Sequence, residues 1–167
     1  MRLRPYKACD AKEIVSWIGN ERDFRKWCAD RYEAYPISAE DMNEHYNRFA
    51  FDDSFYQMTA FDENGIVGHM IMRFTDEKKS MLRFGFVIVN PAFRGRGYGR
   101  EMLRLAIGYV KDNFPVSRID LGVFENNEAA RRCYEAVGFK EYSRRECRMP
   151  IGTWNCTDME LFIETSS

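Results

Sequence analysis

A run of alternating glycines flanked by arginines is the part of the chain best suited to chemistry. It lies between Val87 and Arg100, where an apolar, β-branched segment passes through a proline into a helical pattern. Glycine has no β-carbon, so a phosphate can approach its backbone closely, and the unpaired N–H groups of a helix N-terminus attract negative charge. Guanidinium groups match phosphate oxygens in geometry. The loop therefore predicts a ligand that carries phosphate, most simply a pyrophosphate. Its glycines are Gly95, Gly97 and Gly99, and its arginines are Arg94, Arg96 and Arg100.

Two other phosphate-binding loops do not fit this stretch. The dinucleotide fingerprint requires a glycine three positions after Gly97, where this chain has Arg100. A Walker loop requires lysine and then serine or threonine after its last glycine, where this chain has Arg100 and Glu101. A glycine-rich turn with solvent-exposed arginines and no ligand is the remaining alternative.

A second motif follows the loop after one helical and one strand-like segment. The run from Arg94 to Gly99 resembles the Arg/Gln-x-x-Gly-x-Gly/Ala signature of the GNAT superfamily of acyl-CoA-dependent N-acyltransferases. Six downstream residues resemble the next motif of that superfamily at its usual spacing: Val123, Asn127, Ala130, Tyr134, Gly138 and Phe139. Both motifs occur in order, so the resemblance is specific over residues 83–139, and outside that span only the topology agrees.

The resemblance implies a place for each part of an acyl-CoA. Two adjacent strands would separate because the first carries a bulge, and the exposed backbone of Val87, Ile88 and Val89 would pair with the pantetheine arm and bond the acetyl carbonyl. The loop from Gly95 to Arg100, which includes Tyr98, would hold the pyrophosphate. Asn127 would contact the pantetheine or the nucleotide, or would act only as a helix cap.

Tyr134 is the predicted catalytic residue. Counted from Ala130 at 3.6 residues per turn, Cys133, Tyr134 and Val137 share the side of the helix that faces the sheet. The hydroxyl of Tyr134 then needs a partner. In this superfamily the matching tyrosine protonates the departing CoA thiolate, and the alternative is a core tyrosine whose hydroxyl is satisfied locally. Cys133, on the core side, is a poor candidate for a nucleophile.

The general base and the acceptor pocket are less well defined. Many superfamily members that acetylate protein N-termini have a glutamate where this chain has Gly122, so that assignment is absent here. His69 is another candidate base, or a core histidine. Five aromatic residues could line the acceptor pocket, although aromatic stripes at helical spacing also fill cores: Trp17, Trp27, Tyr32, Tyr35 and Trp154.

The elements that must position these residues follow from hydrophobic periodicity. Strands are predicted at 2–6, 55–61, 66–74, 81–89 and 117–124, with one or two more in 140–163. Helices are predicted after Asp10, which would act as N-cap with Glu13, over 21–30, after Ser38, from the glycine loop to Pro115, and from Asn126 or Asn127 to Val137. The resulting fold class is α/β: a single domain over 1–167 in which an antiparallel meander leads into a parallel strand pair, with helices on both faces.

Composition sets further limits. The chain has 167 residues, 45% apolar and 31% charged, and a net charge of −1, which argues against binding nucleic acid by phosphate neutralisation. No metal site is indicated, no segment resembles a membrane span or signal peptide, and five cysteines without a Cys-x-x-Cys pair indicate free thiols in a reducing cytoplasm. Thirteen acidic and six basic residues between Asp10 and Asn64 would suit a cationic acceptor, or are simply solvated.

These observations predict an enzyme that transfers an acetyl group from acetyl-CoA directly to a primary amine. The alternative is a non-catalytic acyl-CoA-binding or sensing module, supported only by the missing glutamate at position 122. The acceptor could be a small amine, a polyamine, an aminoglycoside, an amino acid or a peptide N-terminus. Either a monomer or a homodimer is compatible with the sequence.

Overall fold

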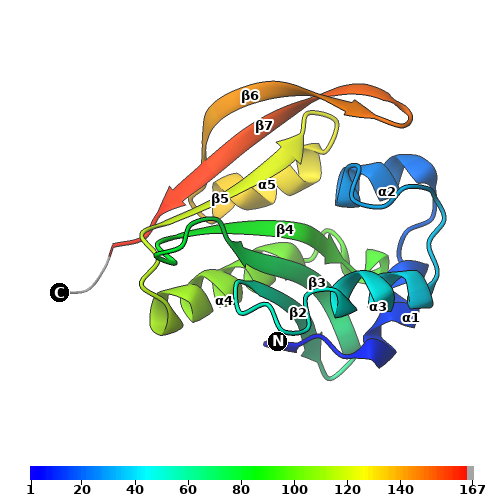
Figure 1. Cartoon of the computed structure of the whole chain (residues 1–167), viewed down its shortest axis with the longest axis horizontal. Helices are drawn as coiled ribbons and strands as arrows, with labels where there is room; N and C mark the ends of the chain where they lie inside the picture. The colour runs from blue at the N-terminus through cyan, green and yellow to red at the C-terminus, as the bar shows by residue number, and fades with distance from the viewer. Residues whose placement is uncertain (165–167) are drawn as a thin grey trace.

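The computed structural model describes residues 1–164, which form one mixed sheet with helices on both faces (Figure 1). The strands are β1 (Arg2–Pro5), β2 (Phe55–Asp62), β3 (Gly65–Phe74), β4 (Met81–Val89), β5 (Arg118–Phe124), β6 (Lys140–Met149) and β7 (Gly152–Phe162). The helices are α1 (Ala11–Ser16), α2 (Glu21–Cys28), α3 (Ala39–Asn47), α4 (Tyr98–Asn113) and α5 (Glu128–Ala136), with short 3₁₀ turns η1 (Ala8–Asp10) and η2 (Pro91–Phe93).

The strand order is β1-β2-β3-β4-β5-β7-β6, and only β4 and β5 run parallel. The predicted meander is confirmed: β2, β3 and β4 pair antiparallel in sequence order. Its first turn is the Asn64-Gly65 hairpin, in which Gly65 has a φ of 95° and Asp62 accepts a hydrogen bond from the Asn64 backbone. The 16-residue helix α4 makes the crossover to β5, as the periodicity predicts.

The two faces of the sheet are covered by different helices and have separate cores. On one face α4 packs its predicted stripe, with Leu103, Ala106 and Val110 all buried, against the meander strands. On the other face α1, α2 and α3 enclose an aromatic core that includes Phe24, Trp27 and Tyr46. Two separate groups of helices therefore pack against opposite faces of the same central strand, β4.

The tail adds an element that the sequence only partly predicts. β6 and β7 form a long hairpin whose turn is Pro150-Ile151, with Gly152 as the first residue of β7. β7, the last strand, inserts antiparallel between β5 and β6. Periodicity identifies the strands of such a hairpin but not which of them pairs with β5.

Asp10 lies at the predicted N-cap position of α1, but its carboxylate has another role. Its φ and ψ are −72° and −26°, which are helical values, and its side chain makes no cap bond. The carboxylate is only 3% exposed and accepts two hydrogen bonds of 2.8 Å from Arg4, one from the Lys7 backbone and one from Thr59. Burial alone would raise the pKa of Asp10, but these hydrogen bonds outweigh it and hold the pKa below its usual value.

Replacing Asp10 by alanine is expected to destabilise the fold by about 3 kcal/mol, because it leaves the part-buried Arg4 guanidinium without its partner. The lowered pKa means that the carboxylate's contribution is full above the ordinary aspartate pKa and is lost as the pH falls through the native value. Urea unfolding at pH 7 measures the first effect, and a series of unfolding curves from about pH 4 downward measures the second. Asp53→Ala, at an exposed ion pair with Lys79, is the control and is expected to change stability by less than about 0.5 kcal/mol.

Candidate functional site

The two parallel strands separate at the centre of the sheet. β4 and β5 pair only where Met81, Leu82 and Arg83 face residues 118–120. Beyond Arg83 the strands diverge toward the end of the sheet near α2 (Figure 1). The β3–β4 register shifts between His69 and Ile71, and Phe86 opposite has a φ of 47°. A bulge in β4 thus accompanies the separation, as the superfamily resemblance predicts, and the β5-facing backbone edge of residues 84–89 has no strand partner.

The glycine loop leads directly from this edge into α4. Gly95 and Gly97 have φ values of 77° and 82°, a left-handed region that other residues rarely adopt, and Gly97 is the N-cap of α4. Gly99 lies in the first helical turn, where an added β-carbon would lie 3.4 Å from the Cys133 sulfur. The loop therefore turns sharply, and the N-terminal N–H groups of α4 remain unpaired within the helix.

A cleft of about 610 Å³ opens where these elements meet. Its lining includes the end of β4, the loop, the start of α4 and one side of α5. Of the residues predicted to bind the cofactor or act on it, eleven line this cleft: Val87, Ile88, Val89, Arg94, Gly95, Gly97, Tyr98, Gly99, Arg100, Asn127 and Tyr134. Arg96 does not line it, and its guanidinium lies 6.0 Å from the centre of the Phe93 ring. The two sequence motifs are thus brought together in one cavity.

Tyr134 lies at the inner wall of the cleft. Its side chain is 6% exposed, and no hydrogen bond from residues 1–164 contributes to the pKa of its hydroxyl. Burial raises the pKa of this phenol above its ordinary value, so the group stays protonated at neutral pH. A buried hydroxyl that faces a cavity without a protein partner is available to a ligand.

Two neighbours of Tyr134 on α5 or at its start also line the cleft. Asn127 occupies the N-cap position of α5, but its side chain makes no cap hydrogen bond and instead lines the cleft. Cys133, predicted to face the core, packs against the core and also lines the cleft, because Gly99 leaves room for its sulfur. The sequence places α5 against the sheet correctly but cannot show how far the cleft extends beside it.

Helix α2 contributes a wall that the sequence analysis treats mainly as core. Trp27 is 9% exposed, yet it lines the cleft, and its indole N–H donates a 3.0 Å hydrogen bond to the carbonyl of Phe86 at the β4 bulge. Trp17 also lines the cleft, as do Asp23 and Lys26, which the sequence analysis missed. Asp23, Lys26 and Trp27 are at helical spacing on α2, and this spacing was the available signal. Only the docking of α2 onto β4 shows which side of the helix faces the cleft.

The remaining aromatic candidates and His69 lie elsewhere. Tyr32 stacks on Trp27, and Trp154 packs on Phe124, without either residue lining the cleft. His69 is fully buried between the sheet and α3, 2.7 Å from the Tyr46 hydroxyl, and burial lowers its pKa to about 3. It is a core histidine with no access to the cleft.

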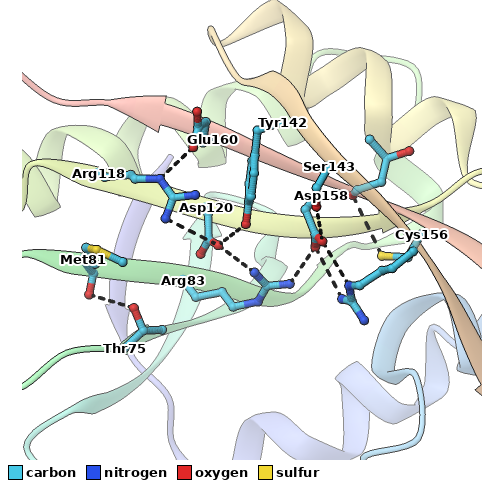
Figure 2. Close-up of polar contacts among 12 residues, drawn as sticks. Thr75, Met81, Arg83, Arg118, Asp120, Tyr142, Ser143, Cys156, Asp158 and Glu160 are labelled. Carbon is cyan, nitrogen blue, oxygen red and sulfur yellow. Dashed lines mark hydrogen bonds and ion pairs between the residues drawn. The ribbon is translucent and has the colours of Figure 1, made fainter.

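The position of the missing glutamate is occupied by guanidinium groups. A β-carbon on Gly122 would lie 2.9 Å from an Arg83 nitrogen and 3.4 Å from an Arg145 nitrogen. Figure 2 shows Arg83 reaching from β4 to both Asp120 and Asp158, at 2.9 and 3.3 Å. Burial would raise the pKa of Asp158, but hydrogen bonds from Arg145 and other groups lower it, so this carboxylate stays ionised and paired.

Within residues 1–164, none of the helices combines the length and apolar composition needed to cross a bilayer. In the same span, no group of three or more His, Cys, Asp or Glu side chains is arranged to hold a metal ion.

Solved structures and curated sequences resemble this chain along much of its length. Spermidine N-acetyltransferase from Vibrio cholerae, solved with CoA and spermine, superposes with a TM-score of 0.81 at 20% identity, over 96% of this chain and 94% of that one. A Bacillus subtilis (strain 168) protein named "Probable N-acetyltransferase YjcK" is 26% identical over 161 residues, 91% of this chain and 87% of the relative.

Spermine/spermidine N(1)-acetyltransferase from the same Bacillus subtilis strain is 31% identical over 65 residues, which are 39% of this chain. The aligned part spans only 43% of that relative's length. The model of the acetyltransferase (GNAT) family matches residues 21–139, which hold the separated strands, the glycine loop and Tyr134. On this match and the shared fold, the chain belongs to the acetyltransferase (GNAT) family.

Proposed function

We propose that this protein is an N-acetyltransferase that moves the acetyl group of acetyl-CoA directly to a primary amine. One observation carries the proposal: the unpaired edge of β4, the left-handed glycine loop and the phenol of Tyr134 all line the same cleft. Family membership and the named acetyltransferases among its relatives support the same activity.

The cleft residues fit the parts of an acyl-CoA. Along Val87, Ile88 and Val89, the side of β4 that faces β5 pairs with no strand of residues 1–164, so its backbone N–H and C=O groups suit the amides of a pantetheine arm. The left-handed turns at Gly95 and Gly97 bring backbone N–H groups to the N-terminus of α4, where a pyrophosphate is stabilised. Arg94 and Arg100 add guanidinium donors, and Asn127 offers an uncommitted amide.

The reaction needs an oriented donor, a neutral amine and a proton for the leaving thiolate. Acetyl-CoA supplies an activated acetyl group as a thioester. The β4 backbone would orient that group, and Tyr134, kept protonated by burial, would donate the proton. Trp27 holds α2 against the β4 bulge through its bond to Phe86 and so fixes the wall from which an amine would approach.

Direct transfer makes a covalent role for Cys133 unnecessary. Replacing Cys133 by alanine is expected to leave kcat within about threefold of the wild type, since only a van der Waals contact beside Gly99 is lost. Steady-state kinetics with the best amine measure this, and a loss of more than about 100-fold would indicate an acyl-enzyme instead.

All five cysteines are free thiols in the structure, which supports the proposed cytoplasmic location.

Thiol release from acetyl-CoA, followed with and without added amines, tests the proposal. The panel would contain polyamines, because two relatives are named for spermine or spermidine, together with aminoglycosides, amino acids and peptides. Thiol release that depends on one amine class supports the enzyme. Tight acetyl-CoA binding with no amine-dependent release would favour a sensing module, and no binding at all would refute the assignment of the cleft.

A further inference from the structure

A second, smaller pocket lies on the opposite face of the separated strands, beneath α2. It has a volume of about 130 Å³ and shares Lys26 and Trp27 with the larger cleft. Its lining includes Gly85 on β4 and Gly122 on β5, two positions where the lack of a side chain lets Ile71, Arg83 and Arg145 approach the strands closely. The pocket therefore adjoins the β4 bulge from the side away from α4 and the glycine loop.

The charged side chains that line this pocket are all basic. Five of them come from five different elements or loops, and no acidic residue of the described chain joins them: Lys26, Arg31, Arg73, Arg83 and Arg145. Two belong to the ion-pair network of Figure 2, because Asp120 and Asp158 neutralise Arg83 and Arg145. Lys26 also has an acidic partner, because its ammonium nitrogen lies 4.0 Å from a carboxylate oxygen of Asp23.

Arg31 and Arg73 remain without a carboxylate partner among residues 1–164. Arg73 is partly buried on β3 and Arg31 is exposed; burial and the positive charges of Arg31 and Arg83 lower the pKa of Arg73 more than the charge of Asp120 raises it, though an arginine stays charged at neutral pH. Holding uncompensated guanidinium groups close together is unfavourable unless an anion binds between them. A polycation entering this pocket would meet only repulsion.

We propose that the pocket binds a carboxylate on the amine acceptor, and that the preferred acceptor is an amino acid or related zwitterion rather than a polyamine. The proposal rests on the proposed function, since it assigns this pocket to the acceptor. Arg73 and Arg31 would bind the anion, Arg83 and Arg145 would be held in place by Asp120 and Asp158, and the amine would point toward the β4 bulge.

Matched pairs of acceptors test this directly. Thiol release is measured with α-, β- and γ-amino acids, with the carboxamide of each, and with spermidine. The amine of a carboxamide is less basic, so more of it is neutral at pH 8, and this bias works against the expected result. For at least one pair, the acid is expected to have a kcat/KM roughly 100-fold above that of its amide and of spermidine.

Arginine variants connect the preference to the pocket. Arg73→Gln and Arg31→Gln are each expected to reduce the acid-to-amide ratio by about tenfold or more, mainly through KM for the acid, while the affinity for acetyl-CoA stays unchanged. Arg104→Gln, exposed on α4 and outside both cavities, should keep the ratio.

Three results would overturn the proposal and leave the acetyltransferase function standing. They are a spermidine or amide rate equal to or above every acid rate, an unchanged ratio in both arginine variants, or turnover of no carboxylate-bearing amine by a protein that binds acetyl-CoA. Failure to bind acetyl-CoA would instead refute the proposed function itself, so the two failures can be told apart.

Discussion

Replacing Gly97 by valine is expected to lower acetyl-CoA affinity by at least about 100-fold while the protein still folds. Gly97 has a φ of 82°, and a β-branched residue in this region is strained by roughly 1–3 kcal/mol. The loop relieves that strain by moving away from the left-handed turn, which removes the N–H groups from the N-terminus of α4 where a pyrophosphate would bind. No atom lies within 4 Å of the added β-carbon, so the core is not disturbed.

Calorimetric titration with acetyl-CoA, together with a thermal unfolding curve, measures both parts of this prediction. Gly108→Val is the matched control, because Gly108 lies in the middle of α4 with no atom within 4 Å of an added β-carbon and no left-handed φ. The control should bind acetyl-CoA as the wild type does. Unchanged affinity in Gly97→Val would show that the loop does not hold the phosphates.

Replacing Tyr134 by phenylalanine is expected to lower kcat by about 100-fold or more, with KM for acetyl-CoA changed by less than about threefold. The variant keeps the ring that packs against Phe139 and loses only the hydroxyl, to whose pKa no hydrogen bond from residues 1–164 contributes. Since burial raises the pKa of Tyr134, the wild-type phenol remains protonated throughout the neutral range and can donate its proton.

Steady-state kinetics and a pH profile distinguish this role from a structural one. Below about pH 10 the profile should show no loss of activity from ionisation of this tyrosine, because a raised pKa moves that loss to higher pH. The control is Tyr109→Phe. Tyr109 lies on α4, packs against Phe114 and is outside the cleft, so this variant should keep the wild-type kcat. A Tyr134→Phe enzyme with wild-type kcat would show that Tyr134 has only a structural role in the core.

Local signals predict most of the central fold. The Asn-Gly hairpin, the mostly apolar run Met81–Val89 that indicates a central strand, and Ser38 with Asp41 three residues on at a helix start each depend on neighbouring residues, and the structure confirms all three. The two motifs lie in one cleft because a strand, a tight loop and a helix leave little freedom between them.

Long-range contacts explain what the sequence does not predict. Asp10 fits a capping box locally, but Arg4 and Thr59 take its carboxylate, and Thr59 is on β2, far along the chain. β7, and not β6, pairs with β5. Packing determines this pairing, and the hydrophobic periodicity of the two strands does not. The basic pocket needs Arg31, Arg73, Arg83 and Arg145 together, and no spacing connects residues so far apart.

The central claim is that this chain moves an acetyl group from acetyl-CoA to an amine. Mass spectrometry with isotopically labelled acetyl-CoA and the amine panel tests it most directly. We expect the label on one amine class, with one CoA thiol released per acetyl group transferred. Label recovered only in acetate or in unreacted acetyl-CoA, in a protein that binds the cofactor, would contradict the claim.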